Sequence, residues 1–144
     1  MGSTSRLKAV ATAAIVALAS AGCHVEPSVG VTVTGTVTTE DGPLSEGLIT
    51  FVPRPGTEGP KVSASLQNGR YAVAAEAGLR PGNFKVEVYG VPPGVKAMAE
   101  GRHPPRGDDS YREIAPAFNS QSRLDATLTT GGNQADFEVR RLPP

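Results

Sequence analysis

The chain has 144 residues, enough for one domain of ordinary size and too few for two. Its 17 glycines and 13 prolines, with 5% aromatic residues and no tryptophan, favour short strands joined by turns over a helical bundle. The 14 basic and 14 acidic residues are scattered and cancel, which excludes the basic stripe that nucleic-acid binding requires. A single cysteine can form no internal disulfide, so the fold must rest on packing alone.

Residues 1–22 have the pattern of an export signal. Arg6 and Lys8 precede an apolar run over residues 9–21, which is shorter than the roughly 20 residues that a helix needs to cross a bilayer core. A charged start, a short apolar run and small residues before a break are typical of a secretory signal rather than of a buried helix in the mature domain.

Cys23 lies where a bacterial lipoprotein signal places its lipidated cysteine. The segment Leu18-Ala19-Ser20-Ala21-Gly22 resembles a lipobox, although Ser20 stands where leucine is favoured. The alternative is ordinary cleavage after Ala21, which would leave Cys23 as a free thiol. Because Cys23 is the only cysteine, we expect it to be the lipidated N-terminus that holds the protein to a membrane. The resemblance favours the outer membrane, on its periplasmic or surface face, since His24 rather than aspartate follows.

After a tether over residues 23–30, short runs of alternating apolar and polar residues predict strands. We expect strands over residues 31–38, 48–52, 61–66, 71–74, 84–89, 124–129 and 135–139. The turns between them include Asp41-Gly42, Asn68-Gly69 and Gly131-Gly132-Asn133. About seven short strands at this spacing predict an all-β domain over residues 31–141, a single antiparallel β-sandwich, with no helix after residue 22.

The apolar positions of these runs predict the core, and the gap in the pattern predicts a loop. The expected core residues are Phe51, Phe84, Val86, Val88, Leu124, Leu128 and Phe137. Lys85, Glu87 and Tyr89 fall on the opposite face of their strand. Residues 90–117 hold five prolines and both signs of charge, so we expect a long exposed loop there, which would also bind any partner.

The order of these motifs resembles the carboxypeptidase regulatory-like domain, which is a transthyretin-like β-sandwich. The resemblance is carried by Val33-Thr34-Gly35-Thr36-Val37, Asp41-Gly42-Pro43-Leu44, Phe51-Val52-Pro53, Asn68-Gly69-Arg70-Tyr71 and Leu79-Arg80-Pro81-Gly82-Asn83-Phe84-Lys85-Val86. The segment Ile114–Ser120 resembles one in small planctomycete-type lipoproteins. Together these matches cover about residues 31–140 and imply that fold, with a role as an accessory or adhesive module that has no active site of its own.

Residues that could carry catalysis or bind a metal are sparse. His24 and His103 are too few for a zinc site, and neither accompanies a nucleophilic serine motif. The pair Asp108-Asp109 lacks the spaced acidic residues of a calcium loop, and we interpret Arg106-Gly107-Asp108 as a chance tripeptide. We therefore expect no catalytic residue, no metal and no cofactor.

The sequence thus predicts a non-enzymatic envelope lipoprotein whose β-sandwich has a structural or protein-interaction role. Its expected partners are the membrane, through lipid on Cys23, and an envelope protein or polysaccharide. The alternative function is a carbohydrate-binding module on the same scaffold, with Tyr89 and Tyr111 as the ligand-binding residues, because aromatic rings give sugars an apolar platform. Tyr71 is expected to close its hairpin instead.

Overall fold

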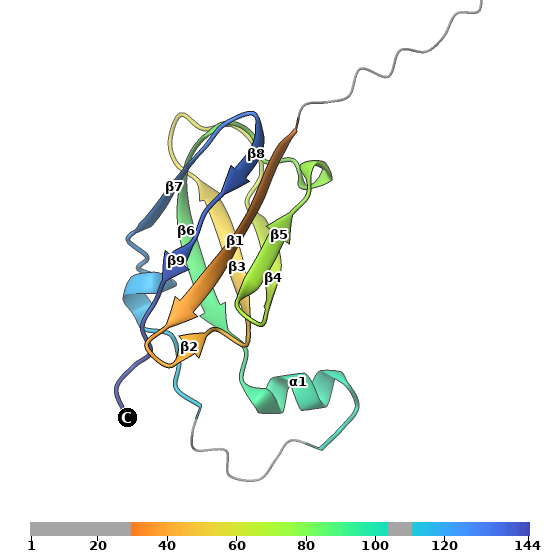
Figure 1. Ribbon diagram of the computed structural model, residues 1–144, viewed down its shortest axis with the longest axis vertical. Helices are drawn as coiled ribbons and strands as arrows, with labels where there is room; N and C mark the ends of the chain where they lie inside the picture. Colours follow the sequence, from red (N-terminus) through yellow and green to blue (C-terminus); the bar gives the residue numbers. More distant parts are fainter. Residues whose placement is uncertain (1–29, 104–110) are drawn as a thin grey trace, which may run out of the picture.

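The computed structural model describes residues 30–103 and 111–144, which form one curled, mostly antiparallel β-sheet (Figure 1). Strands account for 47% of the described residues and helices for 12%, so the predicted all-β class is confirmed. The expected signal over residues 1–22, the lipidation site Cys23 and nearly all of the expected tether lie outside the described residues.

The elements follow one another as short strands with three brief helices. In chain order they are β1 (Val31–Thr39), β2 (Gly42–Pro43), β3 (Glu46–Pro53), β4 (Val62–Gln67), β5 (Arg70–Val73), the 3-10 helix Ala75–Ala77, β6 (Gly82–Gly90), α1 (Pro93–Ala99), the 3-10 helix Pro116–Phe118, β7 (Leu124–Leu128), β8 (Gly131–Gln134) and β9 (Phe137–Glu138).

The strand order is β2-β1-β5-β4-β3-β6-β7, and β8 and β9 both pair with β1. These last two pairings are parallel, with Val31 opposite Gly131 and Val37 opposite Phe137, so the expectation of a purely antiparallel fold is wrong. The segment expected to turn at Gly131 is instead strand β8. Strand pairing uses backbone N–H and C=O groups, which glycine has like any other residue. Because this segment has no alternation of apolar and polar side chains, its sequence gives no strand signal.

The predicted hairpin between β4 and β5 is present at Asn68-Gly69. Both residues have positive φ, 51° for Asn68 and 74° for Gly69. This is the conformation that a two-residue type I′ turn demands and that asparagine and glycine tolerate best. The sequence therefore placed this turn correctly from side-chain chemistry alone.

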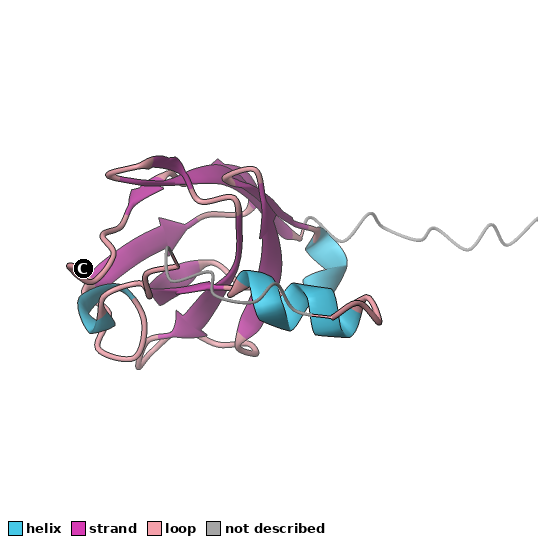
Figure 2. Ribbon diagram, turned by 90° about the horizontal axis from the view of Figure 1, so that it is seen from below, coloured by secondary structure: helices cyan, strands magenta, loops and turns pink. Residues whose placement is uncertain are grey.

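The curled sheet encloses one apolar core (Figure 2). Five of the seven predicted core residues are buried, namely Phe51, Phe84, Val86, Val88 and Leu128; Leu124 and Phe137 are partly buried against the same cluster. The rings of Phe51 and Phe84 meet edge to face, with centroids 6.3 Å apart, the geometry that aromatic pairs prefer. The alternation of β6 therefore predicted correctly which of its faces is buried.

Helix α1 contradicts the expectation of a loop without helix over residues 90–117. Pro93 lies in the first turn of the helix. Backbone N–H groups in this turn have no acceptor within the helix, so the missing N–H of proline costs nothing there, and the fixed φ of proline suits a helix. The residues after it include Lys96, Ala97, Met98 and Ala99, all good helix formers. Ala97 is buried, and Lys96 forms an ion pair with Glu46 on β3, so the helix contacts the end of the sheet. Pro93 therefore starts a helix, whereas the prolines of this segment were interpreted as loop residues.

Burial on β6 gives a paired stability prediction. Phe84→Ala removes a fully buried ring and should lower the free energy of unfolding by roughly 3–5 kcal/mol, through lost transfer energy and the cavity left behind. Tyr89→Ala, on the opposite face of the strand and 37% exposed, should cost about 1 kcal/mol or less. Urea unfolding followed by circular dichroism measures both. Equal losses for the two variants would contradict the assignment of faces.

Candidate functional site

The surface is hollowed at the end of the sheet where α1 follows β6. One hollow, of about 350 Å³, is lined by Tyr89, Gly90, Pro92, Tyr111, Glu113, Ile114 and Asn119, and we call it the tyrosine hollow. A second, of about 400 Å³, is lined by Ser45, Glu46, Val91, Pro93, Lys96, Ala97, Arg102, Tyr111 and Arg141, and we call it the cationic pocket. Tyr111 lines both, so the two hollows adjoin at its ring.

Tyr111 lies close to Gly90 of β6 and to the side chain of Arg141. A Cβ built on Gly90 would fall 2.7 Å from the Tyr111 hydroxyl oxygen, so this hydroxyl lies close against the backbone of β6. The guanidinium carbon of Arg141 lies 5.7 Å from the centroid of the Tyr111 ring, within cation–π range. Burial, together with the charge of Glu113, raises the pKa of Tyr111 above the ordinary tyrosine value, although Arg141 opposes the shift.

Arg141 is itself fixed by several contacts, which makes it a rigid part of this site. Its Nη1 donates a 2.6 Å hydrogen bond to the carbonyl oxygen of Arg112, and its Nε lies 3.8 Å from Oδ2 of Asp41. An isolated antiparallel β-bridge with Ile114, outside the named strands, holds the backbone of Arg141. Its side chain is only 17% exposed, so little freedom is left to lose when a ligand binds.

Tyr89 reaches the tyrosine hollow from the outer face of β6. Its hydroxyl donates a 3.1 Å hydrogen bond to Oε2 of Glu87, and Nζ of Lys85 lies 2.6 Å from Oε1 of the same carboxylate. The structure therefore brings together Tyr89 and Tyr111, the two tyrosines expected to bind ligand. Tyr71 lies elsewhere, buried in the core with its hydroxyl donating to the carbonyl oxygen of Ala135 at 2.6 Å.

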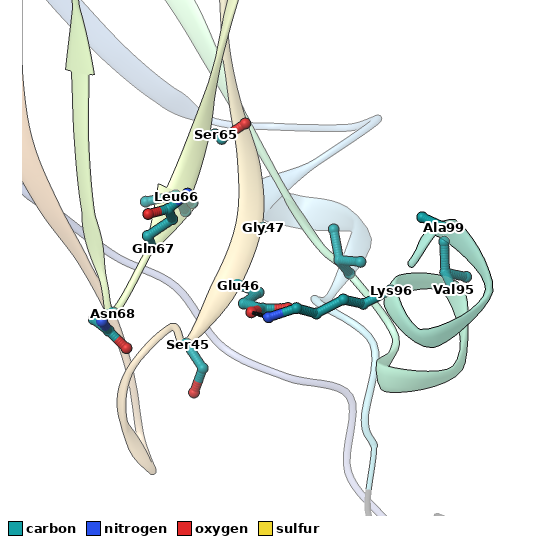
Figure 3. Close-up of a pocket in the computed structure, with 11 residues that line it drawn as sticks. Ser45, Glu46, Gly47, Ser65, Leu66, Gln67, Asn68, Val95, Lys96 and Ala99 are labelled. Carbon is teal, nitrogen blue, oxygen red and sulfur yellow. Dashed lines mark hydrogen bonds and ion pairs between the residues drawn. The ribbon is translucent and has the colours of Figure 1, made fainter. Parts of the chain in front are cut away.

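A groove of about 620 Å³ lies between α1 and the sheet (Figure 3) and shares Ser45, Glu46, Val91 and Lys96 with the lining of the cationic pocket. The side chain of Lys96 crosses it from the helix and forms an ion pair with Glu46 on β3. Val95 and Ala99 face the groove from the helix, and Gly47 and Ser65 line it from the sheet.

Sequence reasoning missed Lys96, Arg102 and Arg141 as site residues. Lys96 and Arg102 were assigned to a loop, whereas they lie in α1 and just after it. Arg141 lies beyond the last predicted strand and meets Tyr111 only through a contact between distant parts of the chain. For Lys96 and Arg102 the sequence signal was a basic residue within the expected loop, and such a residue does not distinguish a site from a solvated surface.

The other sequence candidates do not join the site. His103 is exposed and lines none of the three hollows. Cys23, His24 and the segment from Arg106 to Asp109 lie outside the described residues. Within residues 30–103 and 111–144, no three His, Cys, Asp or Glu side chains gather as metal ligands would, and none of the helices described there is long and apolar enough to span a membrane.

Comparison with protein families, with curated proteins and with solved structures finds no match for this chain. The geometry of the hollows is therefore the observation from which a function can be argued.

Glu87, which holds Tyr89, should titrate below an ordinary glutamate. Its burial would raise the pKa, but hydrogen bonds from Lys85 and Tyr89, together with the positive charges of Lys85 and Lys61, lower it overall. A lowered folded-state pKa means that the ionised carboxylate stabilises the fold above the ordinary glutamate pKa, and that this contribution is lost as the pH falls through the lowered value. Carboxyl carbon NMR of the native protein measures this pKa.

The Lys85→Met variant tests the cause of that shift. Removing the ammonium takes away both the hydrogen bond and the nearest positive charge, so the pKa of Glu87 should rise and acid unfolding should begin at higher pH. Tyr89→Phe should move the pKa in the same direction by a smaller amount. A Glu87 pKa at or above the ordinary glutamate value in the native protein would contradict the geometry.

Proposed function

We propose that the protein is an exported envelope lipoprotein, attached to a membrane by lipid on Cys23, whose β domain has a structural or binding role and catalyses no reaction. The lipobox-like segment before the single cysteine supports the attachment. The linings of the hollows support a binding role, because they combine tyrosine rings with fixed charges and place no histidine beside a nucleophile among the described residues.

The observation that carries this proposal is the position of the hollows relative to the start of the domain. Strand β1 begins at one end of the sheet, where Val31 pairs with Gly131. Strand β6 ends at the opposite end of the sheet, where Gly90 pairs with Gly47. The next residue, Glu46, pairs with Gln67 beside the β4–β5 turn. Figure 1 shows the start of β1 and helix α1 at opposite ends. An anchor joined to the start of β1 would leave the hollows facing away from the membrane.

The domain is proposed to be a transthyretin-like β-sandwich of the carboxypeptidase regulatory-like kind. Strands β4 and β5 pair only through Gln67 and Arg70, next to their turn, so the sheet separates there. One part contains β4, β3, β6 and β7, and the other is built around β1 with β5, β8 and β9. Two such parts packed across one core are what a sandwich requires, which supports the fold expected from the motifs.

A carbohydrate-binding module is the second candidate function, favoured by one observation. Tyr89 and Tyr111 come from segments on either side of α1, yet they line the same hollow. Glu113 and Asn119 place polar atoms in that lining, so ring stacking and hydrogen bonding are both available to a sugar. This candidate is compatible with the first, since an anchored domain can bind a polysaccharide of the envelope.

Attachment through Cys23 is tested by fractionation. Cys23→Ala removes the only thiol that lipid could modify, so the variant should appear in the soluble fraction while the native protein stays with membranes after a carbonate wash. Ser20→Leu is the matched control, because it supplies the leucine that a lipobox favours and should leave the protein membrane-bound.

Two results would overturn the attachment. One is a Cys23→Ala protein that remains with the membranes. The other is a mature N-terminal peptide whose mass shows that it begins at Gly22 with an unmodified thiol at Cys23, as ordinary cleavage would give.

A further inference from the structure

The cationic pocket is lined by charged side chains that the binding of a neutral sugar does not require. Three cationic side chains, those of Lys96, Arg102 and Arg141, line it together with one carboxylate, that of Glu46. Apart from Ser45, the remaining lining residues are apolar or aromatic and include Val91, Ala97 and Tyr111. A ligand that suits this lining carries negative charge beside an apolar ring face.

The three cations differ in how they are held, and the difference favours an anionic ligand. Arg141 is fixed by its contacts with Tyr111, Arg112 and Asp41. Lys96 and Arg102 form their ion pairs at the surface, with Glu46 and Glu100. Exposed pairs of this kind contribute only about 0–1 kcal/mol, so exchanging a surface carboxylate for a ligand carboxylate costs little. The pocket thus offers one rigid cation and two adaptable ones.

The ring of Tyr111 joins this charge to the tyrosine hollow. Because Tyr111 lines both cavities, a sugar unit against this ring lies next to Arg141 and within the space that Lys96 and Arg102 border. The pocket has a volume of about 400 Å³ and the hollow about 350 Å³, so together they offer room for consecutive units of a chain.

We propose that the two cavities form one binding site for an acidic polysaccharide, in which a uronate carboxylate lies among Lys96, Arg102 and Arg141 and a neighbouring sugar face rests on Tyr111 and Tyr89. This inference rests on the carbohydrate-binding candidate and narrows its ligand to acidic sugars. It is independent of lipid attachment at Cys23.

Isothermal titration calorimetry of the full-length protein, solubilised in a polyoxyethylene detergent that carries no sugar headgroup, tests the proposal. Trigalacturonate should bind at low ionic strength, maltotriose should bind at least fivefold more weakly, and the affinity for trigalacturonate should fall as salt is added. Sodium acetate at the same carboxylate concentration should compete poorly, since it lacks a ring to stack on Tyr111.

Variants assign the binding to this site. Arg102→Gln, at a side chain 65% exposed, should fold normally and weaken trigalacturonate binding roughly two- to fivefold, the share of one exposed charge pair. Tyr111→Ala should weaken it by up to roughly tenfold, with circular dichroism confirming its fold. Arg80→Gln is the charge-matched control, because Arg80 lies in the turn before β6, at the opposite end of that strand from the pocket, and should leave the affinity unchanged.

Each contrary result has a distinct meaning. Equal affinity for maltotriose and trigalacturonate would overturn the acidic specificity and leave the carbohydrate-binding candidate standing. Full competition by acetate, with Tyr111→Ala binding normally, would overturn the sugar site in favour of unspecific anion binding. If neither trigalacturonate nor maltotriose gives a binding heat, both the inference and the carbohydrate-binding candidate are overturned. The envelope lipoprotein proposal would still be decided by the Cys23→Ala fractionation.

Discussion

The backbone carbonyl of Ala135 lies against Gly35 of β1, so near that a Cβ built on the glycine would fall 1.8 Å from the oxygen. Tyr71 donates its hydroxyl to this same oxygen at 2.6 Å, and the next residue, Asp136, accepts hydrogen bonds from the amide and the hydroxyl of Thr36 at 2.7 and 2.9 Å. The bonds from Thr36 to Asp136 join segments 100 residues apart in the chain, and the bond from Tyr71 to Ala135 joins segments 64 residues apart. They hold the C-terminal segment along β1 between its two short parallel pairings, and a side chain at position 35 would have no room there. The glycine of the Val-x-Gly-x-Val motif is thus explained by a close backbone approach rather than by turn geometry.

The candidate site depends on this closure, because the C-terminal segment continues directly from β9 to Arg141. Val139 is fully buried in the core, and the carbonyl of Arg140 accepts a hydrogen bond from the amide of Ala115 at 2.8 Å. That contact places the guanidinium of Arg141 over the ring of Tyr111. A segment displaced from β1 would carry Arg141 away, and the cationic pocket would lose a wall. The position of the site, at the end of the sheet away from the start of β1, therefore follows from the same pairing that completes the fold.

The parts of this structure that were predictable are those whose signal is local. The alternation along β6 predicted its buried face correctly, and Asn68-Gly69 predicted its turn because both residues tolerate positive φ. Strand β8 was missed because Gly131 and its neighbours pair through backbone groups, and α1 was missed because Pro93 can start a helix as readily as it bends a loop. Tyr89 and Tyr111 were candidates because aromatic residues are so few, and they line one hollow, whereas Arg141 meets Tyr111 only through long-range packing that no local pattern encodes.

The most direct test of this account is the stability of Gly35→Ala measured against Gly132→Ala in the full-length protein by urea unfolding. Gly132 lies on β8, where the nearest atom to an added Cβ would be 3.8 Å away and φ is not left-handed, so its substitution should change the free energy of unfolding by about 0.5 kcal/mol or less. At Gly35 the added methyl group must displace the Ala135 carbonyl and break its bond from Tyr71, so the account predicts a loss of roughly 1–3 kcal/mol or more. Equal stability of the two variants would show that the C-terminal segment does not lie on Gly35, and would contradict the closure on which the fold and the candidate site depend.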